Sequence, residues 1–430
     1  MQMKTLYKKN IITSYLQMFI AIVLPLIVTP YILNGLGQLQ YGLWVLLTSI
    51  TAYFGLSSFG FTSTLLKDSS SNLQDFMKLS KLVSVTFFSF VFFSLLTTII
   101  FVFVYFNLHN LFTIEANLLD VSKNTFLITF LIFIISFFGS VFDTLLFASN
   151  RLYIKNIVDI VKNILAASSN VYVVYLGYGI FEIALVSLGV TIVYFFILLV
   201  LSRNGLNYSI RWKYFEIELF KNMLQPSIHY FIIGIAVLVV FYTDNLIIGS
   251  FISLSAVAIY SLGYKIVDAT QKVLFKISDV LLPNISVLYS EHKYSEILKL
   301  HNKIMLISVG LAIPAYSLLY FSNQLILSWW LGSDNVLDKD IMTLFIIFSL
   351  IHTWVHVSSI FVAAIGIHKE TSYMALFEAF LNIALSILFL KIYGLFGVAL
   401  GTLVAHILTN GWFVNYWFYR NINKLIKEKK

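Results

Sequence analysis

Five ionisable residues recur at helical spacing inside a segment, 255–288, that is otherwise apolar. They are Lys265, Asp268, Lys272, Lys276 and Asp279. At about 100° per residue they share one helix face, within an arc of roughly 80°. An ionisable group at the centre of a bilayer costs at least ~2.5–3.5 kcal/mol, so such groups usually mark a binding site or an ion pathway. Three cations and two anions on one face indicate the wall of a wet cavity that attracts an anionic group.

The same spacing allows a structural interpretation. Asp268 and Lys272 are an i, i+4 pair, and Lys276 and Asp279 an i, i+3 pair, so the charges could neutralise one another along the helix. Neutralisation explains how an apolar helix tolerates these residues but leaves one cation in excess. We therefore favour a cavity wall.

The segment 153–176 repeats the pattern. Arg151, Lys155, Asp159 and Lys162 form a second stripe within an arc of about 80°. Arg151 and Lys155 lie near the helix end, where long cationic side chains extend to the headgroups. Lys162 lies three turns further in and is the stronger candidate for a cavity-lining cation.

Three acids stand alone in apolar segments, namely Asp143, Asp244 and Glu378. For Asp143 and Asp244 we consider, in this order, ion pairing with the lysines, proton transfer, and polar contact between packed helices. Glu378 is expected to reach Lys162 from the other half of the chain. All three, with Asp159 and Asp279, are candidate coupling or salt-bridge acids.

The sequence contains no complete pattern for a metal site or a cofactor site. His352 and His356 have the i, i+4 spacing of a zinc pair, but the glutamate of the metalloprotease pattern and a third ligand are missing. His229 and His406 are lone histidines near span ends, and the only role that the sequence offers them is that of protonation sites. The chain has no cysteine and no phosphate-binding Gly-Lys-Ser/Thr loop, so we expect no metal, no cofactor, no ATPase and no enzymatic activity.

The composition indicates that these residues are positioned by membrane helices. Hydrophobic residues make up 59% of the 430 residues and charged residues 11%, less than half the ~25% usual in soluble chains. At ~20 apolar residues per crossing, we expect twelve transmembrane helices in an all-α polytopic membrane protein. The expected spans are 11–33, 42–66, 82–106, 125–148, 153–176, 180–202, 225–251, 255–288, 304–323, 341–366, 371–391 and 395–419.

The linkers predict the orientation. Of 28 lysines and arginines, 4 lie within spans, 3 in the outside linkers and the remaining 21 on the side of the two termini. The outside residues are Lys123, Lys339 and Lys391. This asymmetry predicts that both termini are cytoplasmic. It also explains the net charge of +8 without nucleic acid, because cations on that side face anionic lipid.

An internal repeat divides the chain. The sequence from Tyr178-Gly179 to Ala184-Leu185 recurs 215 residues later, from Tyr393-Gly394 to Ala399-Leu400. We expect two six-helix bundles, 1–205 and 225–430, related by a pseudo-two-fold axis along the membrane normal. The linker 206–224 is expected to be an amphipathic helix on the cytoplasmic interface. Its apolar face would carry Trp212, Phe215, Leu219 and Met223.

Several motifs together resemble a known family. They are Leu36-Gly37 with Tyr41-Gly42-Leu43-Trp44, then Tyr53-Phe54-Gly55-Leu56, Asp244-Asn245 with Gly249, and Tyr393-Gly394 with Gly397-Val-Ala-Leu400. The set is similar to the bacterial polysaccharide-export flippases of the multidrug/oligosaccharidyl-lipid/polysaccharide exporter superfamily. The resemblance covers nearly the whole chain, and no single motif carries it.

This resemblance implies two bundles around a central cationic cavity and alternating access between them. It implies transfer of polyprenyl-diphosphate-linked oligosaccharide to the outer leaflet of a bacterial cytoplasmic membrane, for O-antigen, capsule or related glycans. The substrate-binding residues would be the cations of the two stripes with Asp268. The implied partners are membrane lipids, a glycan polymerase with its assembly machinery, and a coupling cation, Na⁺ or H⁺.

Two other function classes are alternatives. A multidrug/cation antiporter of the same fold typically carries a carboxylate in its first span, whereas residues 11–66 contain no acidic residue. A membrane-embedded glycosyltransferase or polymerase would need a large outside loop or a catalytic acid cluster. The longest outside linkers, 107–124 and 324–340, are too short for such a domain.

Overall fold

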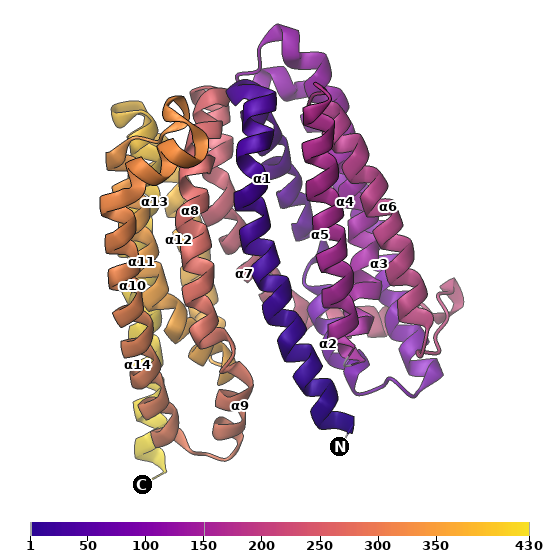
Figure 1. The fold of residues 1–430 in the computed structure, drawn as a ribbon. Coiled ribbons are helices and arrows are strands. Elements are labelled where there is room, and N and C mark those ends of the chain that lie inside the picture. Colours follow the sequence, from indigo (N-terminus) through magenta and orange to yellow (C-terminus); the bar gives the residue numbers. More distant parts are fainter. Residues whose placement is uncertain (1, 150, 430) are drawn as a thin grey trace. The chain divides into compact units, whose positions relative to one another are not determined.

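The computed structural model describes residues 2–149 and 151–429, and the side chains of all of these except 2–8, 226, 229, 230, 233 and 241. Lys4, Lys8 and Lys430, three of the cations counted on the cytoplasmic side, therefore lie outside the described side chains. Throughout the described part the regular structure is helical (Figure 1).

The α-helices are α1 Gln2–Phe54, α2 Phe61–Ser70, α3 Phe76–Leu111, α4 Leu119–Ala148, α5 Leu152–Tyr175, α6 Ile180–Arg203, α7 Ile217–Phe251, α8 Leu254–Asp279, α9 Leu282–Ser290, α10 Tyr294–Leu331, α11 Lys339–Ala364, α12 Lys369–Tyr393, α13 Leu395–Leu408 and α14 Asn410–Glu428. Four short 3₁₀ turns separate some of them, at Gly55–Ser58, Ala116–Leu118, Trp212–Tyr214 and Ser333–Asn335.

The helices are those of a multi-pass membrane protein. Within the described residues, 10 helices are long and apolar enough to cross a membrane, or up to 11 if a bent pair in α7 is counted as one span. The first of these, Lys9–Ser58, contains the expected span 11–33 and the first part of the expected span 42–66, which continues past a break into α2. They are separated at Gly37, whose φ of 73° and ψ of 169° interrupt the helix. A count of twelve spans stays a prediction.

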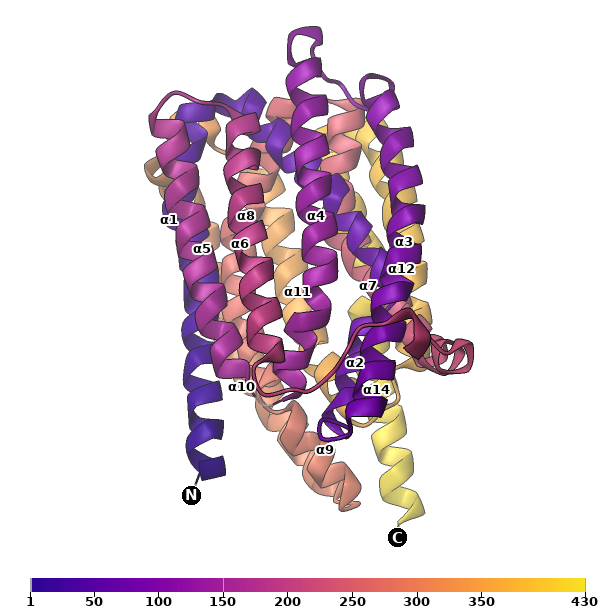
Figure 2. The ribbon, with the colours of Figure 1, turned by 90° about the vertical axis from the view of Figure 1, so that its right-hand side faces the viewer.

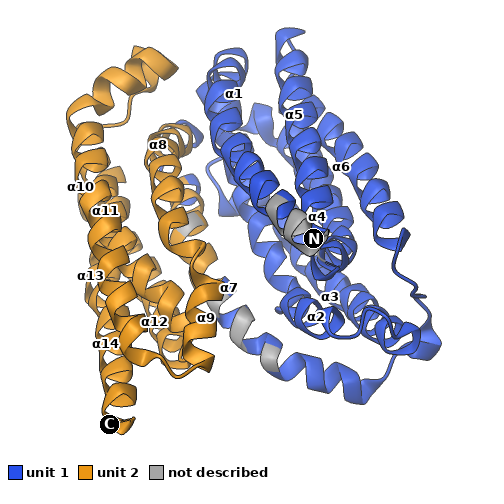
Figure 3. Ribbon diagram, turned by 60° about the horizontal axis from the view of Figure 1, so that its bottom comes forward, with its two compact units in different colours: residues 1–234, 249–255 blue, residues 235–248, 256–430 orange. Residues whose placement is uncertain are grey.

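The chain forms two compact units (Figure 3). Unit 1 contains residues 1–234 and 249–255, and unit 2 contains residues 235–248 and 256–430. The helix α7 thus contributes to both. The expected bundles 1–205 and 225–430, and the pseudo-two-fold axis between them, remain predictions.

Unit 1 is packed largely through aromatic rings. Figure 2 shows α4 between α6 and α3, and α1 lies along α5. Between α3 and α4, Phe101 stacks on Phe130 and Phe90 on Phe137, each with ring centroids 4.0 Å apart. Stacked rings of this kind contribute about 0.5–1.5 kcal/mol beyond the area they bury. They give unit 1 rigid contacts where lipid-facing apolar surface offers no driving force for packing.

Unit 2 contains a close helix pair. A Cβ atom at Gly401 of α13 would lie 2.5 Å from the backbone nitrogen of Ser386 in α12, and one at Gly397 would collide with the carbonyl of Phe389. The two glycines therefore bring α13 against the backbone of α12, as small residues do in membrane helix pairs. This pair positions the polar residues of α13 that are described below.

The linker differs from its prediction. Residues 206–211 are not helical, Trp212–Tyr214 form one 3₁₀ turn, and α7 begins at Ile217. The cause lies in α3: the N–H of Ser209 donates to Ser80 Oγ at 2.9 Å and the N–H of Arg211 donates to Ser84 Oγ at 3.2 Å. Backbone groups satisfied by α3 have no need of a helix. The single amphipathic helix expected here is therefore wrong.

Candidate functional site

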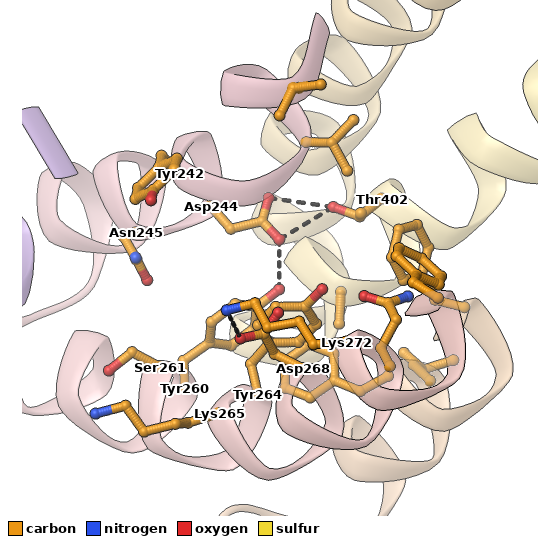
Figure 4. Close-up of a pocket in the computed structure, with 18 residues that line it drawn as sticks. Tyr242, Asp244, Asn245, Tyr260, Ser261, Tyr264, Lys265, Asp268, Lys272 and Thr402 are labelled. Atoms are coloured by element: carbon orange, nitrogen blue, oxygen red, sulfur yellow. Dashed lines mark hydrogen bonds and ion pairs between the residues drawn. The ribbon is translucent and has the colours of Figure 1, made fainter. Parts of the chain in front are cut away.

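The charged face of α8, defined as Lys265, Asp268, Lys272, Lys276 and Asp279, contributes to a pocket of unit 2. Three of its members, Lys265, Asp268 and Lys272, line a cavity of about 470 Å³ (Figure 4). Asp244 of α7 and Thr402 of α13 line the same cavity. The structure thus brings four of the predicted site residues together and leaves Lys276 and Asp279 one to two turns further along α8.

Both ion pairs expected from the spacing are present on this face. Lys272 Nζ lies 2.6 Å from Asp268 Oδ2, and Lys276 Nζ lies 3.8 Å from Asp279 Oδ2. Figure 4 shows the amino group of Lys265 pointing away from the Asp268–Lys272 pair. The side chain of Lys272 is 58% exposed, so its pairing leaves its amino group open to a ligand. Neutralisation and cavity lining therefore coexist.

Asp244 is buried in a set of hydroxyl groups. Tyr260 Oη donates to its Oδ2 at 2.6 Å, and Thr402 Oγ1 lies 3.1 Å from both carboxylate oxygens. Asn382 Nδ2 donates in turn to Thr402 Oγ1 at 2.9 Å. These contacts join α7, α8, α12 and α13. They are contacts of the helix-packing kind, the last of the three alternatives considered for this residue.

In unit 1 the second charged stripe forms a cluster around Lys155. Its Nζ lies 2.6 Å from Asp159 Oδ2 and 3.5 Å from Asp143 Oδ1, so Asp143 is an ion-pair partner of a lysine, the first alternative considered for it. Tyr194 of α6 donates to Asp159 Oδ1 at 2.5 Å. Lys162 Nζ lies 4.3 Å from the centroid of the Tyr194 ring.

The cluster changes the interpretation of two cations. Lys155 was expected to extend to the headgroups, but its side chain is 22% exposed and is held by two carboxylates. Arg151 precedes α5, and its Nη1 donates to the carbonyl oxygens of Leu201 and Asn204, at the end of α6. Arg151 therefore holds the start of α5 against the end of α6, by donating to backbone carbonyls that the helix end leaves unpaired.

Glu378 was expected to reach Lys162, which lies in unit 1. The partners that the structure shows for Glu378 lie within unit 2. His406 Nδ1 lies 2.7 Å from Glu378 Oε1, and both side chains are at most 5% exposed. Thr409 Oγ1 donates to Oε2 at 3.1 Å and Asn410 Nδ2 at 2.6 Å. These three donors, from α13 and the start of α14, hold both carboxylate oxygens, and the expected pairing with Lys162 stays a prediction.

Sequence reasoning missed three participants. His406 was considered only as a protonation site, and its pairing with Glu378 was missed because that partner is 28 positions away on another helix. His356 contacts Asp279 at 2.8 Å and stacks on Phe275, with ring centroids 3.6 Å apart. Tyr194 reads as an ordinary apolar residue of α6. The sequence contained one signal for His356. It shares a face of α11 with His352, and two polar side chains on one face of an apolar helix indicate a polar or charged partner on a neighbouring helix.

No group of three or more His, Cys, Asp or Glu residues arranged to hold a metal ion is found among the side chains that the structure describes. The polar clusters of the two units are instead paired by hydrogen bonds and ion pairs.

Comparisons with known proteins show what this chain is similar to. The family model described as "Polysaccharide biosynthesis protein" matches residues 7–289. Among curated proteins, none matches. The lipid II flippase MurJ, in an inward closed conformation, has a TM-score of 0.73 at 16% identity, over 98% of this chain and 89% of that one.

Multidrug transporters have similar structures as well. An inward-facing multidrug resistance MATE family transporter of the MOP superfamily has a TM-score of 0.71 at 13% identity, over 94% of this chain and 99% of that one. The MATE multidrug transporter DinF-BH has a TM-score of 0.71 at 15% identity, over 98% of this chain and 96% of that one. At these identities the likeness shows a shared fold.

Proposed function

Because the chain belongs to the polysaccharide biosynthesis protein family, we propose that it is a flippase for lipid-linked oligosaccharide. It carries a polyprenyl-diphosphate-linked oligosaccharide from the cytoplasmic to the outer leaflet, for O-antigen, capsule or a related glycan. The supporting observation is the pocket of unit 2, where lysines of a membrane-spanning helix line a cavity of about 470 Å³.

The physical argument concerns the headgroup. A diphosphate cannot enter hydrocarbon unaided, whereas the polyprenyl chain is at home there. Lys265 and Lys272 offer fixed cations whose attraction for phosphate grows as water is excluded. The potential across a bacterial membrane, negative inside, assists, because each negative charge moved outward gains ~2.3 kcal/mol per 100 mV.

The remaining features of the proposal come from the charge asymmetry and from the resemblance stated above. Both termini are cytoplasmic, the protein lies in the cytoplasmic membrane, and alternating access of a cationic cavity moves the headgroup. Lipids surround the protein, and a glycan polymerase with its assembly machinery receives the product. A cation, Na⁺ or H⁺, is coupled to the cycle.

A multidrug/cation antiporter is the second candidate, and the similarity to two MATE transporters favours it. The acid-free stretch 11–66 argues against it, since a cationic drug requires a carboxylate where this chain has none. The charged face of α8 has three lysines and two aspartates, which suits an anion better than a cation.

The decisive experiment deletes the gene in the native host and measures lipid-linked oligosaccharide on each leaflet together with surface glycan. A flippase predicts that complete oligosaccharide accumulates on the cytoplasmic leaflet and that surface polymer is lost. Normal glycan with altered efflux of drugs or dyes would establish the antiporter instead. Accumulation of single repeat units on the outer leaflet would indicate a polymerase.

A further inference from the structure

A row of histidines leads to the buried Glu378. On α11, His352 and His356 lie one turn apart, and the ring of Phe275 from α8 packs against both, at 5.5 and 3.6 Å between centroids. The ring of His352 lies 5.0 Å from that of His406 on α13. His406 in turn contacts Glu378 of α12. Three imidazoles thus connect Asp279, on the charged face of α8, with a carboxylate inside unit 2.

The inner end of the row has a defined protonation geometry. When Glu378 is ionised it only accepts hydrogen bonds, and the Nδ1 of His406 then carries the proton that it shares with Glu378 Oε1. The second carboxylate oxygen already accepts from Thr409 and Asn410. The Nε2 of His406 is buried and has no hydrogen-bond partner among the described residues. A buried nitrogen with an unused lone pair, on an imidazole oriented by a carboxylate, is a proton acceptor.

The outer end of the row is open. His356 is paired with Asp279 at 2.8 Å, and their side chains are 20% and 33% exposed. Lys276 also lies beside Asp279, at 3.8 Å. Intramembrane chains of histidines and carboxylates are the usual construction of proton relays, because imidazole takes up and releases protons near neutral pH.

We propose that Glu378 and His406 form a proton-binding site, which His356 and His352 connect to the charged face of α8. A proton entering at His356 passes to His352 and then to Nε2 of His406, where it converts the imidazole to imidazolium beside the Glu378 carboxylate. The charge of the pair changes from −1 to 0, and no other reactant is needed.

The site lies where it can act on the backbone. Thr409, which donates to Glu378, stands between α13 and α14 with a φ of −122° and a ψ of −105°. Proton uptake withdraws part of the negative charge that holds the hydroxyl of Thr409 and the amide of Asn410. The geometry of the break between the two helices therefore responds to protonation.

Other titratable groups face the site from neighbouring helices. On α7, Asp244 contacts Thr402, which lies one turn before His406 on α13. On α8, Asp279 and Lys276 face the outer histidine. Asp244 is held by the hydroxyls of Tyr260 and Thr402 and has no histidine among these contacts, so the site at Glu378 is separate from it.

The test uses the full chain in lipid nanodiscs, labelled with ¹⁵N at its 8 histidines and titrated from about pH 5 to about pH 9. We expect one buried imidazole whose Nε2 signal changes with pH and is lost in H406Q. E378Q keeps the size of the side chain but removes its charge and one of the two oxygens that accept hydrogen bonds. The pH dependence of the His406 signal should therefore change in this variant. H301Q is the matched control, since His301 is equally buried but lies outside the row.

Two results would overturn the proposal. The first is a His406 that keeps one protonation state over the whole pH range, which the wild-type protein alone reveals. The second concerns the row: in H352F and H356F the exchange of the His406 proton with water should slow several-fold. Unchanged exchange in both variants would remove His352 and His356 from the path.

The coupling of this site to transport rests on the proposed function, and a separate measurement tests it. The deletion host is complemented with E378Q, and surface glycan is compared with that of the wild type at several external pH values. Loss of the pH response supports coupling. A normal pH response in E378Q, in a host whose deletion blocks flipping, overturns coupling and leaves the flippase intact. If His406 titrates in nanodiscs but deletion of the gene leaves surface glycan normal, the flippase proposal is overturned and the proton site remains.

Discussion

At the scale of residues, several charges carried by helices have partners close at hand. Lys155 has two carboxylate neighbours, Lys272 is paired with Asp268, and Glu378 has three donors. Pairs within one helix could be predicted from i, i+3 and i, i+4 spacing. Glu378–His406 could not, because its members stand on different helices and only the packing of α12 against α13 brings them together. Single residues therefore carry the sharpest tests.

The first residue-scale prediction concerns substrate binding. Replacing Lys265 and Lys272 by alanine should reduce glycan export by at least about tenfold, equivalent to roughly 1.4 kcal/mol of lost interaction with the diphosphate. Export is measured in the complemented deletion host with protein level as the reference. The matched control is K424A/K427A on α14, which removes two exposed cations outside this pocket. Full export by K265A/K272A would exclude the pocket as the diphosphate site.

The second concerns the cluster in unit 1. Lys155→Met leaves Asp143 and Asp159 facing each other without their cation, and an unpaired buried charge costs about 3–5 kcal/mol. The thermal unfolding midpoint of the purified protein should fall clearly. The double variant K155M/D159N should recover part of the loss. Lys424→Met, at an exposed pair with Glu428, should leave the midpoint unchanged.

At the scale of elements, periodicity predicts where helices run but not what holds the segments between them. Most of the expected apolar segments coincide with helices, because a bilayer requires each backbone group to be satisfied within its own segment. The expected spans 42–66, 255–288 and 395–419 are the exceptions, since each runs across a break between two helices. The linker before α7 was mispredicted because its backbone N–H groups are satisfied by Ser80 and Ser84 of α3. A hydrophobic periodicity in the linker sequence carries no information about hydroxyls that are more than 120 residues away.

One element-scale prediction concerns the α12–α13 pair. Gly401→Ala should destabilise the protein by about 1–3 kcal/mol, the usual cost of overpacking, because its Cβ meets the backbone of α12. Gly310→Ala in α10 is the control, since a Cβ at that position meets no described atom within 4 Å. Unfolding midpoints of the two variants should therefore separate. Equal unfolding midpoints would show that α12 can move away from the added methyl group at little cost in stability.

A second concerns the start of α3 and its pH dependence. Asp75 caps this helix by accepting from the N–H groups of Lys78 and Met77 at 3.0 and 3.1 Å. The hydrogen bond from the Lys78 backbone, with the Lys78 charge, lowers the pKa of the Asp75 carboxyl below its ordinary value. The stabilisation is therefore present above the ordinary pKa and is lost as the pH falls through the lowered one.

Hydrogen exchange of residues 76–80 measures this cap. Exchange in D75A should be faster than in the wild type at neutral pH, and the two should converge in acid. D75N, which keeps an acceptor oxygen, should stay close to the wild type at neutral pH. If D75A and the wild type exchange alike at neutral pH, the cap contributes nothing to α3.

At the scale of the whole molecule, the all-helical membrane fold could be predicted from composition and from the apolar segments, whereas the expected bundles 1–205 and 225–430 stay a prediction. Each half of the repeat has six apolar segments, so the sequence predicts that the boundary between the two bundles lies in the polar linker that joins them. The structure places residues 235–248 in unit 2 but returns residues 249–255 to unit 1, where Thr113 donates its N–H and its hydroxyl to the carbonyl of Gly249. Such tertiary contacts leave no periodic signature.

The orientation is tested by labelling single cysteines, since the natural chain has none. Cysteines replacing Lys123 and Lys391 should react with a membrane-impermeant maleimide in intact cells. Cysteines replacing Lys67 and Lys299 should react only after the cells are opened. If a cysteine of one group reacted like those of the other group, the expected number of spans before that position would be wrong.

The division of α7 between the units has a further consequence. Its first half, together with residues 249–255, belongs to unit 1, although both lie beyond the linker, and Thr64 and Ser227 hydrogen-bond within that unit at 2.8 Å. Unit 1 is therefore completed by residues that follow the linker in the sequence. Cutting the gene at the linker would therefore give an N-terminal fragment that lacks part of its own fold and depends on the other fragment to complete it.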